Sequence, residues 1–244
     1  DGVEAIKALV GLERAWIPPQ RGTSLYVRPF MIATDPFVGV RPSATYKFII
    51  ILSPVGNYYP QGIDPVKIYV ENKYVRAVKG GLGFTKAAAN YAASLKSQEE
   101  AHAKGYVQVL WLDGVERKYI EEVGTMNVFF KIGGRIVTPS LEGSILPGIT
   151  RASAIDILKD AGYDVTERRL SIEEVYQAQT DGKLDEAFGT GTAAVISPIG
   201  ELNWNDRKIL INDQKIGEVS KLIYDTITSI QYGERYDKFN WTVE

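Results

Sequence analysis

Segments typical of strands and of helices follow one another in this chain without a regular strand–helix–strand repeat. Residues 46–55 (YKFIIILSPV) are β-branched and continuously apolar, which predicts a strand buried on both faces. Residues 87–105 run from three alanines to a glycine through helix-forming residues, which predicts a strong helix. Because the two kinds of segment mix irregularly, we predict an α+β fold, or a mixed α/β fold with mixed sheets.

The remaining segments agree with this mixed fold. Gly133 and Gly134 can both take positive φ and predict the turn of a hairpin over 126–140. Ser171 and Glu174 have the spacing of a capping box and predict the start of a helix. Turn-forming residues at 57–65 predict a linker. Strands are also predicted at 25–33, 106–113, 117–123, 193–202 and 208–217, with two short ones within 67–78, and helices at 1–16, at 218–233 and from Pro147-Gly148 to about Gly162.

Composition gives no sign of a nucleic-acid or membrane partner. The formal net charge is −2 over 244 residues, so no basic surface is expected. No apolar run approaches the ~18 residues that span a bilayer. The chain has no cysteine, which excludes disulfides, a thiolate nucleophile and cysteine zinc sites and is compatible with the reducing cytoplasm where we place the protein.

The single histidine narrows the possible chemistry. His102 lies in the polar stretch EEAHAKG, where a solvated position at a helix end is expected. A Ser-His-Asp triad would need this residue, and a multi-histidine metal site needs more histidines than the chain has. In an enzyme of this composition, proton transfer therefore falls to Lys, Tyr, Asp or Glu, and no metal site is predicted.

Lys86 stands in GGLGFTKAAANY, among glycines, alanines and a threonine and without an acidic neighbour. A surface lysine at a helix start is the ordinary interpretation. However, a site poor in water and acids lowers the pKa of a lysine and makes its amine a nucleophile. The small neighbours would also let a bulky, flat partner approach.

Two other glycine turns and one acid extend this constellation. Pro147-Gly148 precedes a predicted helix, whose free N–H groups suit a phosphate, and Thr192 follows Gly189-Thr190-Gly191. Each turn alone is compatible with an ordinary turn, and neither is a P-loop or a dinucleotide fingerprint. Glu122 ends a predicted strand, and Glu121 is expected to point to the opposite face. Lysine, phosphate cradle, tyrosine and distant acid together fit pyridoxal phosphate better than a nucleotide.

Several motifs resemble the branched-chain amino acid aminotransferases, pyridoxal 5′-phosphate enzymes of fold type IV. In family order they are LYVRPFMIATDPFVGV, ILSPVGNYYP, GLGFTKAAANYAASLKSQEEAHAKG, VLWLDG, EEVGTMNVFF, LEGSILPGITRAS, EAFGTGTAA and IQYGERYD. The resemblance implies that 1–56 is the C-terminal part of a small α/β domain, 57–70 an interdomain linker and 71–244 a large pseudo-barrel domain that binds the cofactor. It also implies a homodimer that uses amino acids and 2-oxo acids, by a ping-pong route from leucine, isoleucine or valine to 2-oxoglutarate.

The resemblance implies a role for each matching residue. Lys86 is expected to hold the cofactor and to shuttle the α-proton. On the cofactor side, Tyr91 is expected at the ring hydroxyl and Glu122 at the ring nitrogen, with Arg76 near the cofactor. The phosphate is expected to bind the N–H groups of Ile149 and Thr150 and the hydroxyl of Thr192. On the substrate side the resemblance implies Tyr26, Arg28, Tyr58, Thr125 and Ala193.

The chain departs from the family pattern in two places. Residues 194–197 read AVIS where the family has a redox CxxC, so no thiol switch is expected. The family also begins well before Asp1, and a phosphate-gripping arginine has no counterpart, so we expect the chain alone to bind cofactor weakly and to turn over slowly. Two alternatives stay open: another fold type IV enzyme, such as a D-amino acid aminotransferase or an aminodeoxychorismate lyase, and a non-catalytic truncated fragment.

Overall fold

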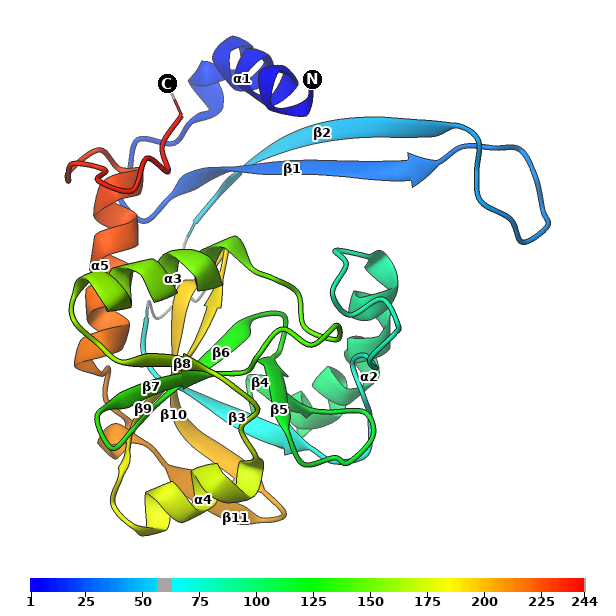
Figure 1. The fold of residues 1–244 in the computed structure, drawn as a ribbon. Coiled ribbons are helices and arrows are strands. Elements are labelled where there is room, and N and C mark those ends of the chain that lie inside the picture. Colours follow the sequence, from blue (N-terminus) through cyan, green and yellow to red (C-terminus); the bar gives the residue numbers. More distant parts are fainter. Residues whose placement is uncertain (57–62, 244) are drawn as a thin grey trace. The chain divides into compact units, whose positions relative to one another are not determined.

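The computed structural model describes residues 1–56 and 63–243, and the chain divides into two compact units, Asp1–Pro60 and Gln61–Glu244. Figure 1 labels the elements of both units.

The described residues of the first unit form an α-helix, a short 3-10 helix and a two-stranded ribbon. Helix α1 (Gly2–Leu12) is followed by the short 3-10 helix η1 (Arg14–Trp16), as the amphipathic pattern of 1–16 predicts. Strands β1 (Ser24–Ala33) and β2 (Tyr46–Val55) pair antiparallel along their whole length. No residue of β2 is fully buried, so the prediction of a strand buried on both faces is wrong. The described part of this unit has no further strand to enclose the ribbon.

A curled mixed sheet forms the body of the second unit. Its strand order is β5-β4-β3-β10-β9-β6-β7-β8, with β11 paired to β10, and it contains both parallel and antiparallel pairs. An isolated bridge from Val123 to Met126 links the end of β5 to the start of β6, so the sheet curls back toward its first edge. The mixed α/β prediction is confirmed. The strands are β3 (Val66–Glu71), β4 (Gln108–Leu112), β5 (Ile120–Val123), β6 (Asn127–Ile132), β7 (Arg135–Thr138), β8 (Val165–Glu167), β9 (Leu184–Gly191), β10 (Val195–Trp204) and β11 (Arg207–Leu210).

Helices cover this sheet on separate sides (Figure 1). Helix α2 (Ala88–Ala103) packs on β4, while α3 (Ile149–Asp160) and α5 (Glu218–Gln231) pack on each other and on β9. The main core lies under α3 and α5, where the rings of Phe129 and Phe188 stack 5.3 Å apart. Helix α4 (Ile172–Thr180) contacts β9 and β11, and the short helix η2 (Asn212–Gln214) precedes α5.

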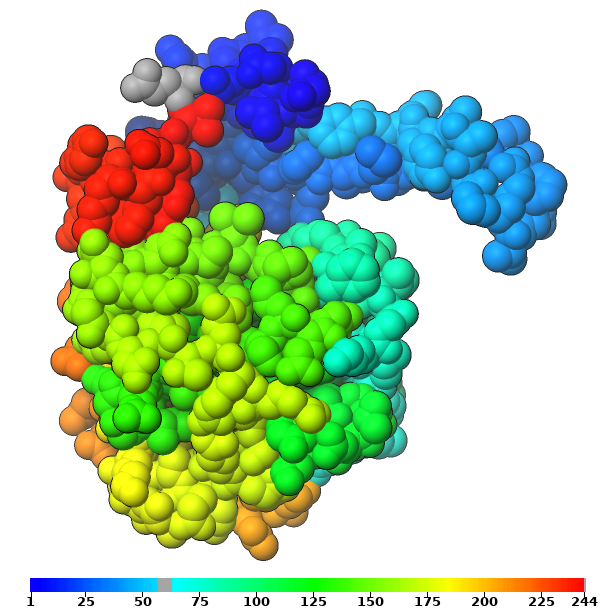
Figure 2. All heavy atoms as spheres, viewed as in Figure 1, coloured from blue at the N-terminus to red at the C-terminus, as the bar shows by residue number. Residues whose placement is uncertain are grey.

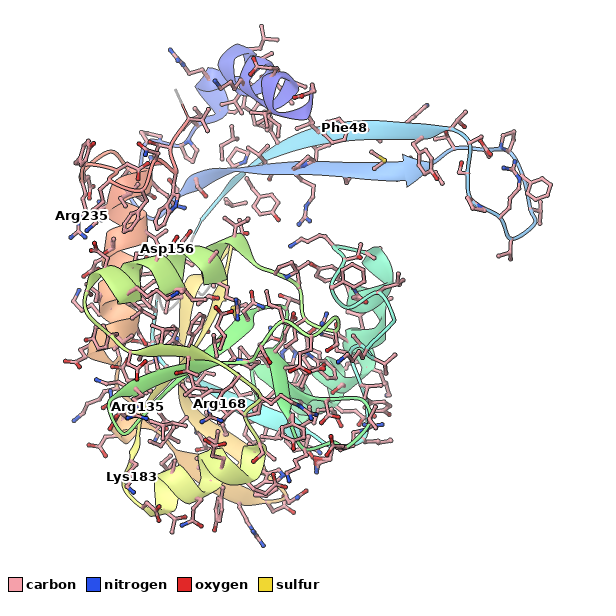
Figure 3. The ribbon with its side chains drawn as sticks, in the orientation of Figure 1. Phe48, Arg135, Asp156, Arg168, Lys183 and Arg235 are labelled. Carbon is pink, nitrogen blue, oxygen red and sulfur yellow. The ribbon has the colours of Figure 1, made fainter. Side chains whose placement is uncertain are left out.

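Local sequence signals explain several of these boundaries. Gly133 and Gly134 take φ of 57° and 79°, so the predicted hairpin turn between β6 and β7 is confirmed. Ser171 Oγ accepts a hydrogen bond of 3.1 Å from the N–H of Glu174 and caps α4. The reciprocal half of the capping box does not form, because the Glu174 carboxylate pairs with Arg168, which Figure 3 labels beside this helix.

Three other features of the structure differ from the elements predicted from the sequence. Residues 72–78 form no strand, because the Glu71 carboxylate accepts hydrogen bonds from the N–H groups of Lys73 and Tyr74 and turns the chain. Strand β3 begins at Val66, inside the range predicted as linker. Strands β8 and β9 were not predicted, although β9 lies in the middle of the sheet. Within the described ranges, no helix combines the length and the apolar character needed to cross a membrane.

Candidate active site

Lys86 lies two residues before α2, in a turn that the structure braces from two sides. The Asn90 side chain donates to the carbonyls of Leu82 and Thr85 at 2.8 Å each. Gly83 lies so close to the segment around Ser144 that a Cβ on Gly83 would lie 2.1 Å from the Ser144 carbonyl oxygen. The Lys86 amine consequently projects over the Tyr91 ring, with 6.0 Å between its nitrogen and the ring centroid.

The surroundings of Lys86 differ from the prediction in one respect. The Lys86 side chain is exposed. The expectation of a water-poor site around this amine is therefore wrong for the chain as described. Glu122 is nevertheless close enough for the Lys86 charge to lower its pKa, so the lysine and the acid share one region.

Glu122 and Arg76 form a buried ion pair beneath this turn. Glu122 is 3% exposed and Arg76 9%, and Arg76 Nε lies 3.3 Å from Glu122 Oε2. The Nε–H makes no hydrogen bond within the described residues, so the attraction is Coulombic. Instead, a terminal nitrogen of Arg76 donates to the Ser144 carbonyl, and the N–H of Leu146 donates to Glu122 Oε1 at 2.9 Å.

The pKa of Glu122 reflects this burial. The pKa of Glu122 is raised from 4.5 to about 7, because desolvation outweighs the opposite effects of Arg76, the Leu146 N–H and Lys86. A carboxyl with this pKa holds or releases a proton near neutral pH. The strand prediction also holds, since Glu121 and Glu122 line different pockets on opposite sides of β5.

A small pocket brings together three of the predicted cofactor-side residues and one predicted substrate-side residue, Thr125. Its lining includes Arg76, Tyr91, Glu122 and Thr125, together with Gly83, Thr85, Asn90, Ser94, Gly124 and Leu146. In the space-filling view, residues around 80–95 lie beside the segment around 120–146, which agrees with the Arg76–Ser144 hydrogen bond (Figure 2). Segments that lie far apart in sequence thus form one site.

The N-terminus of α3 forms a second part of the site. Gly148 is its N-cap residue, no side chain caps it within the described residues, and Ile149 next to it is 82% exposed. Asn127 fixes this end, because it donates to the Leu146 carbonyl at 2.9 Å and a Cβ on Gly148 would lie 2.2 Å from its Oδ1. Uncapped N–H groups at a helix start bind anions.

Asn127 also connects this helix end with the other glycine turn. It pairs with Thr190 of β9, and the turn that follows carries Thr192 and Ala193, both of them exposed. The Thr190 hydroxyl is buried and makes no hydrogen bond within the described part of the chain. Asn127, at the start of β6, therefore lies between the 147–150 turn and the end of β9, from which the 189–192 turn continues.

The remaining predicted residues belong to the first unit. On β1, the Arg28 guanidinium donates to the Tyr26 hydroxyl and lies 4.9 Å from the centroid of its ring. Tyr58 lies outside the described residues.

Sequence reasoning missed the residues that support the site. Asn90 holds the Lys86 turn, Asn127 holds the α3 N-terminus, and Ser144 accepts from Arg76. Their functions depend on contacts between distant segments. The only local signal was their position inside the motifs AAANY, GTMN and LEGSILPG.

The residues present fit pyridoxal phosphate. A carboxyl that titrates near neutral pH suits a ring nitrogen that carries a proton, and an uncapped helix start suits a phosphate. An accessible amine above a tyrosine ring suits attachment of an aldehyde.

Comparison with known proteins agrees with this chemistry. The model of the family "Amino-transferase class IV" matches residues 5–202. Branched-chain-amino-acid aminotransferase 2 of Bacillus subtilis (strain 168) is 62% identical over 242 residues, which cover 99% of this chain and 67% of that protein.

Solved structures show the same fold. The branched-chain amino acid aminotransferase of Escherichia coli has a TM-score of 0.76 at 32% identity, over 89% of this chain and 69% of that one. The T.th. branched-chain amino acid aminotransferase with pyridoxamine 5′-phosphate has a TM-score of 0.81 at 28% identity. The match covers 98% of this chain and 73% of that one.

Fold and site together define a pyridoxal-phosphate transaminase of fold type IV. The chain belongs to the class IV aminotransferase family, and the predicted family, fold and cofactor are confirmed. It spans about two thirds of the length of the relatives it matches.

Proposed function

We propose that this chain transfers the amino group of leucine, isoleucine or valine to 2-oxoglutarate with the help of pyridoxal 5′-phosphate. The observation that carries this proposal is the placement of Lys86 over Tyr91, beside the buried Glu122–Arg76 pair. Relatives that are 56–62% identical and named as branched-chain-amino-acid aminotransferases support the substrate class over a D-amino acid enzyme or a lyase.

The cofactor, when bound, supplies a carbonyl carbon for the amine and a ring that takes up the electron pair of the substrate Cα–H bond. Lys86 Nζ would hold the cofactor, and the same amine would take up and return the proton of the substrate Cα. Its exposure leaves this nitrogen accessible to both partners. Tyr91 supports the ring hydroxyl from the first turn of α2.

Glu122 holds the proton at the ring nitrogen. In the chain as described, its raised pKa leaves the carboxyl partly protonated near neutral pH. A protonated ring nitrogen and Arg76 together would favour the ionised carboxylate, because two cationic groups then face one acid. Arg76 thereby positions Glu122, since the hydrogen bond from a terminal nitrogen of Arg76 to the Ser144 carbonyl fixes the guanidinium.

The phosphate belongs at the start of α3. The N–H groups of Ile149 and Thr150 would donate to it, and the Thr192 hydroxyl would add a donor from the neighbouring turn. This placement is supported by the uncapped helix end and by Asn127, which touches both segments.

The roles proposed for the substrate side follow the matching family motifs. Tyr26 and Tyr58 would wall an apolar pocket, and Arg28 would receive the second carboxylate of glutamate. Thr125 and Ala193 would face the substrate's first carboxylate. We further propose a cytoplasmic homodimer that acts in branched-chain amino acid biosynthesis.

Amine exchange tests this proposal. Leucine and 2-oxoglutarate with added pyridoxal 5′-phosphate should give glutamate, and D-alanine and aminodeoxychorismate should not be consumed. Lys86→Ala should lower the rate at least ~10³-fold, whereas Lys96→Ala, an exposed lysine of α2 paired with Glu100, should change it less than twofold. Absence of glutamate, or full activity of Lys86→Ala, would overturn the proposal.

A further inference from the structure

A second cavity, of about 270 Å³, lies on the other side of β5 from the proposed cofactor pocket. The two share no lining residue, although Glu121 faces one and Glu122 the other. The wall between them is β5 and the segment 144–146, with Ser144 and Ile145 on one side and Leu146 on the other. This cavity is therefore a separate site and does not depend on the proposed function.

Glu121 is the unusual group in its lining. The side chain is 8% exposed, and its Oε1 accepts a hydrogen bond from the Ser144 hydroxyl. Its Oε2 is buried and receives no hydrogen bond from any described residue. A buried acceptor without a donor is unfavourable, so this oxygen calls for a donor.

The other charges of the lining are already compensated. The Asp113 carboxylate accepts four backbone N–H groups, from Val115, Glu116, Lys118 and Tyr119. Glu116 pairs with Arg169 at 3.0 Å, and Glu142 pairs with Lys79 at 3.6 Å. Four carboxyl groups thus face two cations, and Glu121 is the one acid of this lining with neither an ion pair nor a set of backbone N–H donors among the described residues.

These charges select the kind of ligand. An anion would meet an excess of carboxylates, and a metal ion would need several ligands, whereas no group of three metal-binding side chains exists among the described residues. Val115, Pro139 and Ile145 add an apolar wall. A cationic N–H donor on an aliphatic body meets both requirements.

We propose that this cavity binds a small aliphatic molecule that carries a protonated primary amine, with the ammonium donating to Glu121 Oε2. The amine can belong to a free alkylamine or to an amino acid, whose carboxylate would then face Arg169. Burial raises the pKa of Glu121 above its usual range, and a bound ammonium would restore the ionised carboxylate.

The test uses 3-methylbutylammonium as the probe and the neutral 3-methylbutan-1-ol as its isostere. The chain is loaded with pyridoxamine 5′-phosphate, which has no aldehyde to condense with the probe, and calorimetry is repeated without cofactor. The ammonium should bind with Kd below ~5 mM and the alcohol at least ~10-fold more weakly. A third arm with leucine and a fourth with 4-methylvalerate are read as the difference between wild type and Glu121→Gln, because the cofactor pocket can bind both molecules. A larger difference for the valerate than for the ammonium would overturn the proposal.

Glu121→Gln keeps the shape and the Ser144 contact, and it should weaken ammonium binding at least ~10-fold. The matched control, Glu99→Gln on the exposed face of α2, should change it less than twofold. Independently of any variant, NMR contacts of the probe methyl groups should reach Ile145 and Tyr119 and not Tyr91. No binding, equal binding by Glu121→Gln, or contacts to Tyr91 would each overturn the proposal.

Discussion

Arg76 Nε lies 3.3 Å from Glu122 Oε2, and both side chains are buried. The pair occupies the floor of the pocket below Lys86, where burial raises the pKa of Glu122 to about 7. Because the carboxyl is neither fully ionised nor fully protonated near neutral pH, its charge responds to whatever binds against it. The first two predictions concern this pair.

The stability of the cofactor-free chain should depend on pH through Glu122. Between pH 4.5 and about 7 the folded chain binds a proton that the unfolded chain has released, so the free energy of unfolding falls as pH rises through this window. The expected loss from this one group is about 3 kcal/mol. Urea unfolding of wild type and Glu122→Gln at several pH values measures this loss as the difference between their two curves of unfolding free energy against pH. A wild-type stability that rises relative to the variant as pH increases, or a difference that stays flat, would contradict the assigned pKa.

Replacing Arg76 removes the partner of a buried acid. Arg76→Met should lower the free energy of unfolding by about 3 kcal/mol at pH 8, since an uncompensated carboxylate remains in the interior. At pH 5 the loss should be smaller, because Glu122 is then protonated. Arg135→Met is the control: its ion pair with Asp164 is exposed, so its loss should stay below about 1 kcal/mol. Equal losses of unfolding free energy for Arg76→Met at both pH values would contradict an ion pair between Arg76 and an ionised Glu122.

Glu186 should stabilise the start of α5. Its carboxylate accepts hydrogen bonds from the N–H groups of Val219 and Ser220 and from the Ser220 hydroxyl, at 3.0–3.1 Å. Glu186→Ala is therefore expected to lower the free energy of unfolding by about 2 kcal/mol. Glu218→Ala, which loses only an exposed carboxylate paired with Lys131, should cost less than about 1 kcal/mol in the same denaturation series. The reverse order would show that Glu186 is not the cap.

Gly83 should tolerate no side chain, because it lets the Lys86 turn approach the segment around Ser144. A methyl group there would lie 2.1 Å from a backbone oxygen, which cannot swing away as a side chain could. Gly83→Ala is expected to lose about 2 kcal/mol of unfolding free energy and to weaken cofactor binding, both followed by thermal unfolding with and without cofactor. Gly11→Ala on α1, where an added methyl meets nothing within 4 Å, should be neutral or slightly stabilising.

Local signals were sufficient for elements whose boundaries depend on near neighbours. The glycine pair at 133–134, the Ser171 cap and the helix after Gly148 lie where the sequence predicted them. Strand β9 was missed because Gly189 and Gly191 suggest only a turn. In the structure they bring the strand against Val123 and Met126, where a Cβ would lie 2.9–3.0 Å from those side chains. Glycine is therefore required at these two positions by a tertiary contact, which no local sequence pattern reveals.

In the candidate site, too, local motifs identified residues, whereas contacts between distant segments could not be predicted. Lys86, Tyr91 and Glu122 were named from motifs, and the structure places them around one pocket or beside it. The exposure of Lys86 and the pairing of Arg76 with Glu122 were not predicted. Both depend on how the segments 76–86 and 120–146 fold against each other, and burial and ion pairing are properties of that packing.

Borohydride reduction of the chain with pyridoxal 5′-phosphate, followed by peptide mass spectrometry, tests the central claim most directly. Reduction fixes the cofactor to the nitrogen that carries it, so the method does not depend on turnover. We expect a phosphopyridoxyl group on Lys86, in the peptide that contains GGLGFTK, and none there in Lys86→Ala. Modification of another lysine in preference to Lys86, or no modification at saturating cofactor, would contradict the account.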